Sequence, residues 1–67
     1  MKITTKKKDG RIEAVGGRKR ASVPTQGKGW EYVVHVAAAV KLAVVLGAPG
    51  VLWVADLPDG RIQWATK

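Results

Sequence analysis

The 67-residue chain contains no cysteine, no phenylalanine and a single histidine, His35. Without cysteine it can form neither disulfides nor thiolate metal sites, and one histidine cannot make a histidine-cluster metal site. A core this small is usually marginal unless a disulfide, a metal or a second subunit supports it. With the first two excluded, we expect support from oligomerisation or from unusually good packing, and we expect no cofactor.

Acidic residues are also few, and this makes the chain strongly basic. Twelve Lys and Arg residues stand against five Asp and Glu, giving a net charge of +7. Residues 1–28 hold nine of the basic residues and two of the acidic ones, whereas residues 29–67 hold three of each. Charge concentrated in one part of a chain predicts an anionic partner, most commonly nucleic acid. The alternative is a lysine-rich strand edge that keeps a small apolar protein soluble.

No long hydrophobic run is present. The first eight residues carry charge with no apolar stretch behind them, so they do not resemble a secretory signal, and we predict a cytoplasmic protein. The segment 33–46 is apolar but too short to span a bilayer, and it contains His35 and Lys41, so we expect no membrane partner. We predict one domain over residues 1–67, with a flexible basic arm over residues 1–8 as the alternative.

The phrase Asp-Gly-Arg-Ile occurs twice, at residues 9–12 and at residues 59–62. Asp-Gly between β-prone runs is a strong signal for a hairpin turn. In the second copy, Pro58 suits the first central position of a type I turn, and Gly60 suits the left-handed position that follows. The repeat therefore predicts two hairpin turns, one near each end of the domain, and not a ligand-binding motif.

The segment between these hairpins predicts a helix over Trp30–Leu46, and Gly16-Gly17 indicates a further turn into a third strand at 18–23. The predicted fold is α+β: a small antiparallel sheet of two hairpins, with four or five strands in ββ(β)αββ order. One central helix packs across one face of this sheet.

The helix is apolar on nearly all sides. A stripe of valines with spacings of three and four predicts the face against the sheet: Val33, Val36, Val40 and Val44. On the opposite face Glu31 and His35 are followed by Ala38, Leu42 and Val45. Because one small sheet covers only one helix face, we predict a homodimer that buries the C-terminal half of this second face. The predicted self-association residues are Ala38, Leu42 and Val45.

Basic clusters and one tryptophan make up the predicted binding site. If residues 6–8 and 18–20 lie on neighbouring strands, they form one positive patch that Lys28 extends. The predicted residues for nucleic-acid or acidic-partner binding are Lys6, Lys7, Lys8, Arg18, Lys19, Arg20, Lys28 and Trp30. We expect Trp53, in an apolar and therefore central strand, and Trp64 to belong to the core.

No nucleophile–base pair, metal-ligand set or phosphate-loop motif is present, so we predict that the chain is not an enzyme. The pattern is similar in outline to several small bacterial and phage domains, although no motif is specific to one family. The favoured function is a small basic nucleic-acid-binding protein that contacts phosphates through its N-terminal basic patch. The alternative is a protein-interaction module, such as a small phage-type inhibitor or accessory subunit, that docks on an acidic surface of a host protein complex.

Overall fold

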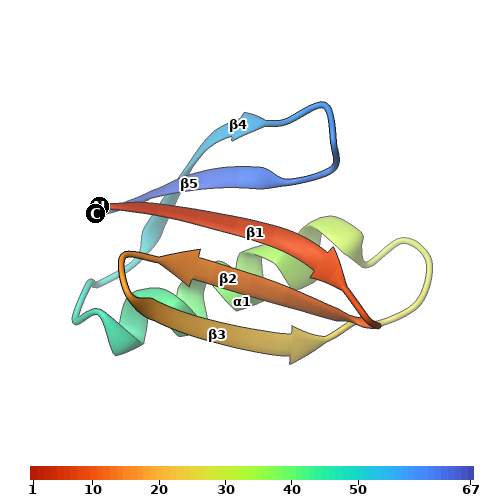
Figure 1. Cartoon of the computed structure of the whole chain (residues 1–67), viewed down its shortest axis with the longest axis horizontal. Coiled ribbons are helices and arrows are strands. Elements are labelled where there is room, and N and C mark those ends of the chain that lie inside the picture. The colour runs from red at the N-terminus through yellow and green to blue at the C-terminus, as the bar shows by residue number, and fades with distance from the viewer.

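The computed structural model describes residues 1–67 and contains one five-stranded sheet and one helix (Figure 1). The elements are β1 (Lys2–Lys8), β2 (Arg11–Gly16), β3 (Lys19–Pro24), α1 (Glu31–Val45), β4 (Val51–Asp56) and β5 (Ile62–Thr66). All neighbouring strands are antiparallel, and the strand order is β3-β2-β1-β5-β4. The predicted α+β class, strand order along the chain and single helix across one face are confirmed. A flexible arm over residues 1–8 is the alternative prediction. Residues 2–8 instead form β1 and pair with strands on both sides.

Both Asp-Gly pairs form the predicted hairpin turns. Asp9 and Gly10 have φ angles of 51° and 76°, the left-handed values that a two-residue type I′ turn requires. In the β4–β5 connection the N–H of Gly60 bonds the carbonyl of Leu57 at 3.1 Å, and Gly60 itself has φ 94°. The turn between β2 and β3 lies one residue later than predicted, because Gly16 still pairs with Lys19 as the last residue of β2.

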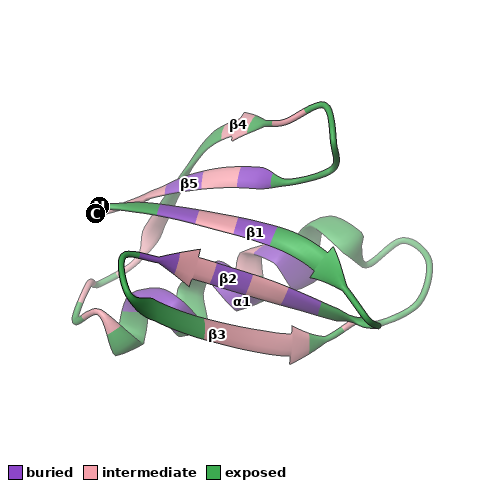
Figure 2. Ribbon diagram, in the orientation of Figure 1, coloured by how far each residue is buried: buried purple, intermediate pink, exposed green.

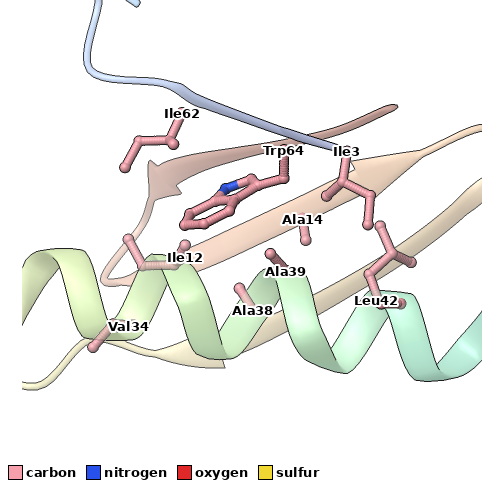
Figure 3. Packing of buried hydrophobic residues seen from close by; sticks show 10 residues of the cluster. Ile3, Ile12, Ala14, Val34, Ala38, Ala39, Leu42, Ile62 and Trp64 are labelled. Atoms are coloured by element: carbon pink, nitrogen blue, oxygen red, sulfur yellow. The ribbon is translucent and has the colours of Figure 1, made fainter. Parts of the chain in front are cut away.

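One face of the sheet forms the core with α1 (Figures 2 and 3). Alternation along each strand sends every second side chain toward the helix, and the register aligns these positions across β3, β2, β1 and β5. The buried strand residues on this face are Ile3, Thr5, Ile12, Ala14, Gly16, Ile62 and Trp64. The prediction that Trp64 belongs to the core is confirmed, since only 3% of its surface is exposed.

The helix packs on the sheet through the face opposite to the predicted one. Its buried residues are Val34, His35, Ala38, Ala39, Leu42 and Ala43. Val33, Val40 and Val44 face solvent instead, and Val44 is 71% exposed. The sheet already contributes bulky side chains such as Trp64, so small alanines on the helix allow a close approach. A Cβ on Gly16 would lie 3.2 Å from Leu42 Cδ2, which shows how little space remains.

The prediction that Trp53 lies in a central strand is wrong. β5 lies between β1 and β4, which makes β4 an edge strand. Trp53 pairs with Trp64 and so points to the helix side of the sheet, but α1 packs mainly against β1, β2 and β3 (Figure 1). Trp53 is therefore 53% exposed. The one helix, α1, is too short to cross a membrane.

Candidate nucleic-acid interface

No helix or loop covers the second face of the sheet, which we call the open face. Figure 1 looks onto this face, with α1 behind the strands. Alternation places Lys2, Lys6 and Lys8 of β1 here, because the intervening Ile3 and Thr5 are buried on the helix side. The register adds Arg11, which pairs with Lys8, and Arg20, which pairs with Val15 of β2.

The charge on the open face is strongly positive. The five cations are Lys2, Lys6, Lys8, Arg11 and Arg20, and all five are exposed. Glu13, opposite Lys6 on β2, is the one acidic strand residue on this face. Arg61 also borders this face, in a shallow hollow with Lys6, but it forms a 2.7 Å ion pair with Asp59. Hydrogen bonds from the N–H and guanidinium of Arg61 lower the pKa of Asp59, so this carboxylate stays charged and compensates Arg61.

Arg11 is held in place by its neighbour on β3. Its Nε donates to Ser22 Oγ at 3.1 Å, and a second guanidinium nitrogen donates to the Ser22 carbonyl at 3.4 Å. These bonds use only part of the donor capacity of the guanidinium, which has five N–H groups. The remaining donors are available to an anion above the sheet.

The open face carries no aromatic side chain. Trp53 and Trp64 point to the helix side, where Tyr32 lies 6.0 Å from Trp64 between ring centroids. Trp30 is 55% exposed, and it lines a hollow with Val33 and other helix-side residues. The face can therefore bind phosphates through its cations, but it offers no ring on which a base could stack.

The predicted single patch is not observed, because its residues divide between different places. Strands β1 and β3 are parallel to each other on either side of β2, so residues 6–8 and 18–20 lie at opposite ends of the sheet. Alternation and register turn Lys7 and Lys19 to the helix side, and Arg18 lies in the β2–β3 turn. Of the predicted residues, Lys6, Lys8 and Arg20 share the open face.

Sequence reasoning missed Lys2 and Arg11 as members of this face. Both are isolated in the sequence, so a search for basic clusters passes over them. The signal that would have found them is strand alternation, since Lys2, Lys6 and Lys8 are all separated by even steps.

Lys7 and Lys28 meet at a different site, at the N-terminal end of α1. They line a cavity of about 250 Å³ together with Glu31 and His35. Glu31 accepts a 2.9 Å hydrogen bond from the N–H of Gly29, which fixes the loop before the helix.

His35 links this cavity to a buried polar network. Its Nδ1 lies 2.7 Å from Thr5 Oγ1, which also accepts a 2.9 Å hydrogen bond from Trp64 Nε1. Burial lowers the pKa of His35 below its usual value of 6.5, and the charge of Asp56 opposes this shift. Thr5 is completely buried, so its hydroxyl cannot meet a substrate, and the network is structural.

No group of three or more His, Asp or Glu side chains comes together to hold a metal ion.

No protein-family model matches the chain, and no curated protein or solved structure matches it either. The case for a function therefore depends on the geometry of its own surfaces.

The predicted self-association residues have different environments. Ala38 and Leu42 are completely buried between α1 and the sheet and cannot contact a second molecule, whereas Val45 is 54% exposed. This corrects the predicted interface, because the helix face assigned to a partner is the one that packs on the sheet.

Proposed function

We propose that the chain binds the phosphate backbone of nucleic acid through the open face of its sheet. The observation that carries the proposal is the charge on this face: five exposed cations on three adjacent strands, with Glu13 as the one acidic strand residue among them. Lysine and arginine side chains bind phosphate oxygens without reading the base sequence. The face is uncovered, so an extended polyanion can lie across several strands.

Duplex nucleic acid fits this face better than a single strand. Proteins that hold single strands usually stack successive bases on aromatic rings, and the open face has none. A duplex presents its phosphates outward and needs only positive charge. We therefore expect tighter binding to duplexes than to single strands of the same length, with little preference for sequence.

Two matched triple variants test the role of the open face. The first is Lys6→Ala with Lys8→Ala and Arg20→Ala, on the open face. The second is Lys7→Ala with Lys19→Ala and Lys28→Ala, on the helix side. Each removes three positive charges, so the net charge changes equally and only the location of the lost charges differs.

Fluorescence anisotropy of a labelled duplex at two salt concentrations gives the comparison. Five phosphate contacts predict a slope of about −4.5 for log K against log salt, or about 500-fold weaker binding at 200 mM than at 50 mM salt. The open-face variant should bind about 10²-fold or more weakly and lose about 2.7 units of this slope. The helix-side variant should lose about fivefold or less, because charges beyond about 10 Å are screened.

Equal losses in the two variants would show that net charge alone drives binding and would contradict the assignment to the open face. No binding of any duplex at low salt would refute the nucleic-acid proposal altogether. That result would favour an acidic protein surface as the partner of the same face.

A further inference from the structure

The solvent-facing side of α1 carries a row of apolar side chains along its length, and the neighbouring Lys41 donates to the Ser22 carbonyl on β3. Val33, Ala37, Val40 and Val44 recur at spacings of three and four, and we call this row the valine ridge. Its valines are 53%, 39% and 71% exposed, in chain order. Trp30 and Tyr32 flank the ridge at its N-terminal end and are 55% and 53% exposed.

An exposed row of this kind is unusual in a chain with so many charges. Seventeen of the 67 residues are Asp, Glu, Lys or Arg, yet none lies in the ridge. Surface helices normally present polar residues to water, and contiguous exposed apolar patches mark interaction sites. The ridge does not contribute to the core, because α1 packs on the sheet through its other face.

We infer that two copies of the chain pair through their valine ridges about a two-fold axis. A partner for this surface must be apolar, because the ridge has no charge to attract an acidic or basic protein. A second copy offers an identical ridge on a helix of 15 residues, about 22 Å long. In an isologous contact residue i of one copy meets residue j of the other and j meets i, so only residues near the two-fold axis meet their own equivalents, and two equal ridges match in length.

The distribution of charge favours this arrangement over pairing through the open faces. The open faces lie on the far side of each molecule from the ridge, and each molecule is 18 Å thick along its shortest axis. Pairing through the ridges therefore separates the two cationic faces by well over the screening length of about 10 Å at 0.1 M salt. Any contact that used the open faces would bring like charges together.

The available area allows a weak dimer. The helix-side face measures 30 by 21 Å, which limits the footprint to at most roughly 600 Å² for each copy. A total of at most roughly 1,200 Å² lies at the lower end of stable interfaces, so we expect dissociation in the micromolar range or weaker. Ala37, between Val33 and Val40, allows the two helices to approach closely.

Sedimentation equilibrium at micromolar concentrations tests the pairing. The monomer mass is 7.2 kDa, so the dimer should appear at about 14 kDa. Val40→Lys and Val44→Lys should each raise the dissociation constant about 100-fold, because each buries an unpaired charge in the interface. Circular dichroism checks that the variants keep the helix.

Leu52→Lys is the matched control. Leu52 is 54% exposed, close to the 53% of Val33, but it pairs with Ala65 and so lies on the open face. The substitution adds the same charge and removes a similar apolar surface, and the dimer should persist. A monomeric mass for the unmodified chain, or a dimer that Leu52→Lys dissociates and Val40→Lys does not, would overturn the inference.

Engineered cysteines provide a second measurement. Because the chain has no cysteine, a single Ala37→Cys or Val40→Cys has only its equivalent in another copy as a partner. Mild oxidation should link these variants into covalent dimers much faster than Leu52→Cys. Equal rates at the two faces would count against the ridge. Nucleic-acid binding uses the opposite face, so Val40→Lys should keep it, and either proposal can fail without the other.

Discussion

Replacing Thr5 by valine should remove a large part of the stability of the domain. Thr5 Oγ1 is completely buried and holds two other buried groups: it lies 2.7 Å from His35 Nδ1 and accepts a 2.9 Å bond from Trp64 Nε1. It also lies 3.4 Å from the carbonyl of Ile62. The hydroxyl has one hydrogen and two lone pairs, so it can serve these partners together. No buried polar side-chain atom in the structure lacks a partner.

The expected cost follows from the groups that Thr5→Val leaves behind. Valine has nearly the same shape as threonine, so packing changes little while the Trp64 N–H and His35 Nδ1 lose their partner. Each buried polar group without a partner costs about 1–3 kcal/mol, so the variant should lose about 2–5 kcal/mol. A domain of this size has a free energy of unfolding of roughly 3–10 kcal/mol. The loss is thus about half of the total.

Urea denaturation followed by tryptophan fluorescence and by circular dichroism measures this change. Thr5→Ser is the control, because it keeps the hydroxyl and loses only one buried methyl, at about 1 kcal/mol. The expected order of stability is therefore Thr, Ser, Val. If Thr5→Val were as stable as the unmodified chain, or more stable than Thr5→Ser, the three-residue network would contribute no net stability and our reasoning would be wrong.

Two further predictions concern acid stability and packing. Burial lowers the pKa of His35 in the folded chain, so as pH falls below about 6.5 the His35 side chain is protonated in the unfolded chain before it is protonated in the folded one. The free energy of unfolding should therefore decrease by up to about 1.4 kcal/mol per pH unit below that pH and should be flat above it. His35→Gln should remove this slope in pH-dependent denaturation, and an unchanged slope would assign it to another group. Gly16→Ala should destabilise by about 1–3 kcal/mol, since the new Cβ would lie 3.1 Å from both Ile3 Cγ1 and the Lys2 carbonyl oxygen. A Cβ at Gly50 would meet only the flexible Lys67 side chain, at 3.5 Å or more, so Gly50→Ala should change thermal stability little; comparable losses at both glycines would contradict the tight packing at Gly16.

Local chemistry was sufficient to predict the turns and the elements. The two turns have residue types that favour the required backbone angles by themselves, at Asp9-Gly10 and at Pro58-Asp59-Gly60. The helix was predictable from its length and its glycine boundaries. These features depend on residues that are close together in the sequence, which is why the sequence alone could predict them.

The helix orientation could not be predicted, because both faces of α1 are apolar. Whether α1 turns Val40 or Ala38 toward the sheet depends on the width of the gap between the helix and the sheet. Side chains such as Ile12 and Trp64 already fill much of that gap, and the small Ala38 and Ala39 fit between the helix and the sheet (Figure 3). Volume complementarity of this kind involves residues that are far apart in the chain.

The open face was only partly predictable for a related reason. Of the predicted basic residues, only Lys6, Lys8 and Arg20 share this face, because the face of each residue depends on register and its neighbours depend on strand order. The insertion of β5 between β1 and β4 moved Trp53 to an edge, and the position of β2 between β1 and β3 separated Lys6 from Arg20. No local signal specifies either arrangement.

The pairing of β1 with β5 has a consequence for how the chain folds. β1 is the central strand of the sheet, and Ile3 lies opposite Trp64 across the seam between β1 and β5. Met1 and Thr66 are also joined, by a 2.9 Å bond from the N–H of Thr66 to the Met1 carbonyl. Closing a loop that includes nearly the whole chain is slow compared with forming a hairpin, so this seam should limit the rate of folding.

The same seam implies that residues 62–66 must be synthesised before the core can form. Until residues 62–66 leave the ribosome, β1 has an unpaired edge, and the β1–β3 meander lacks Trp64. A circular permutant that joins Met1 to Lys67 through a short linker and opens the chain at Gly17-Arg18 would turn the seam into a local hairpin. The long-range closure would then move to the β2–β3 pairing at the edge of the sheet, because opening the chain at Gly17-Arg18 places these two strands at its opposite ends. If the central seam limits the rate, the permutant should fold faster, without a change in its final structure.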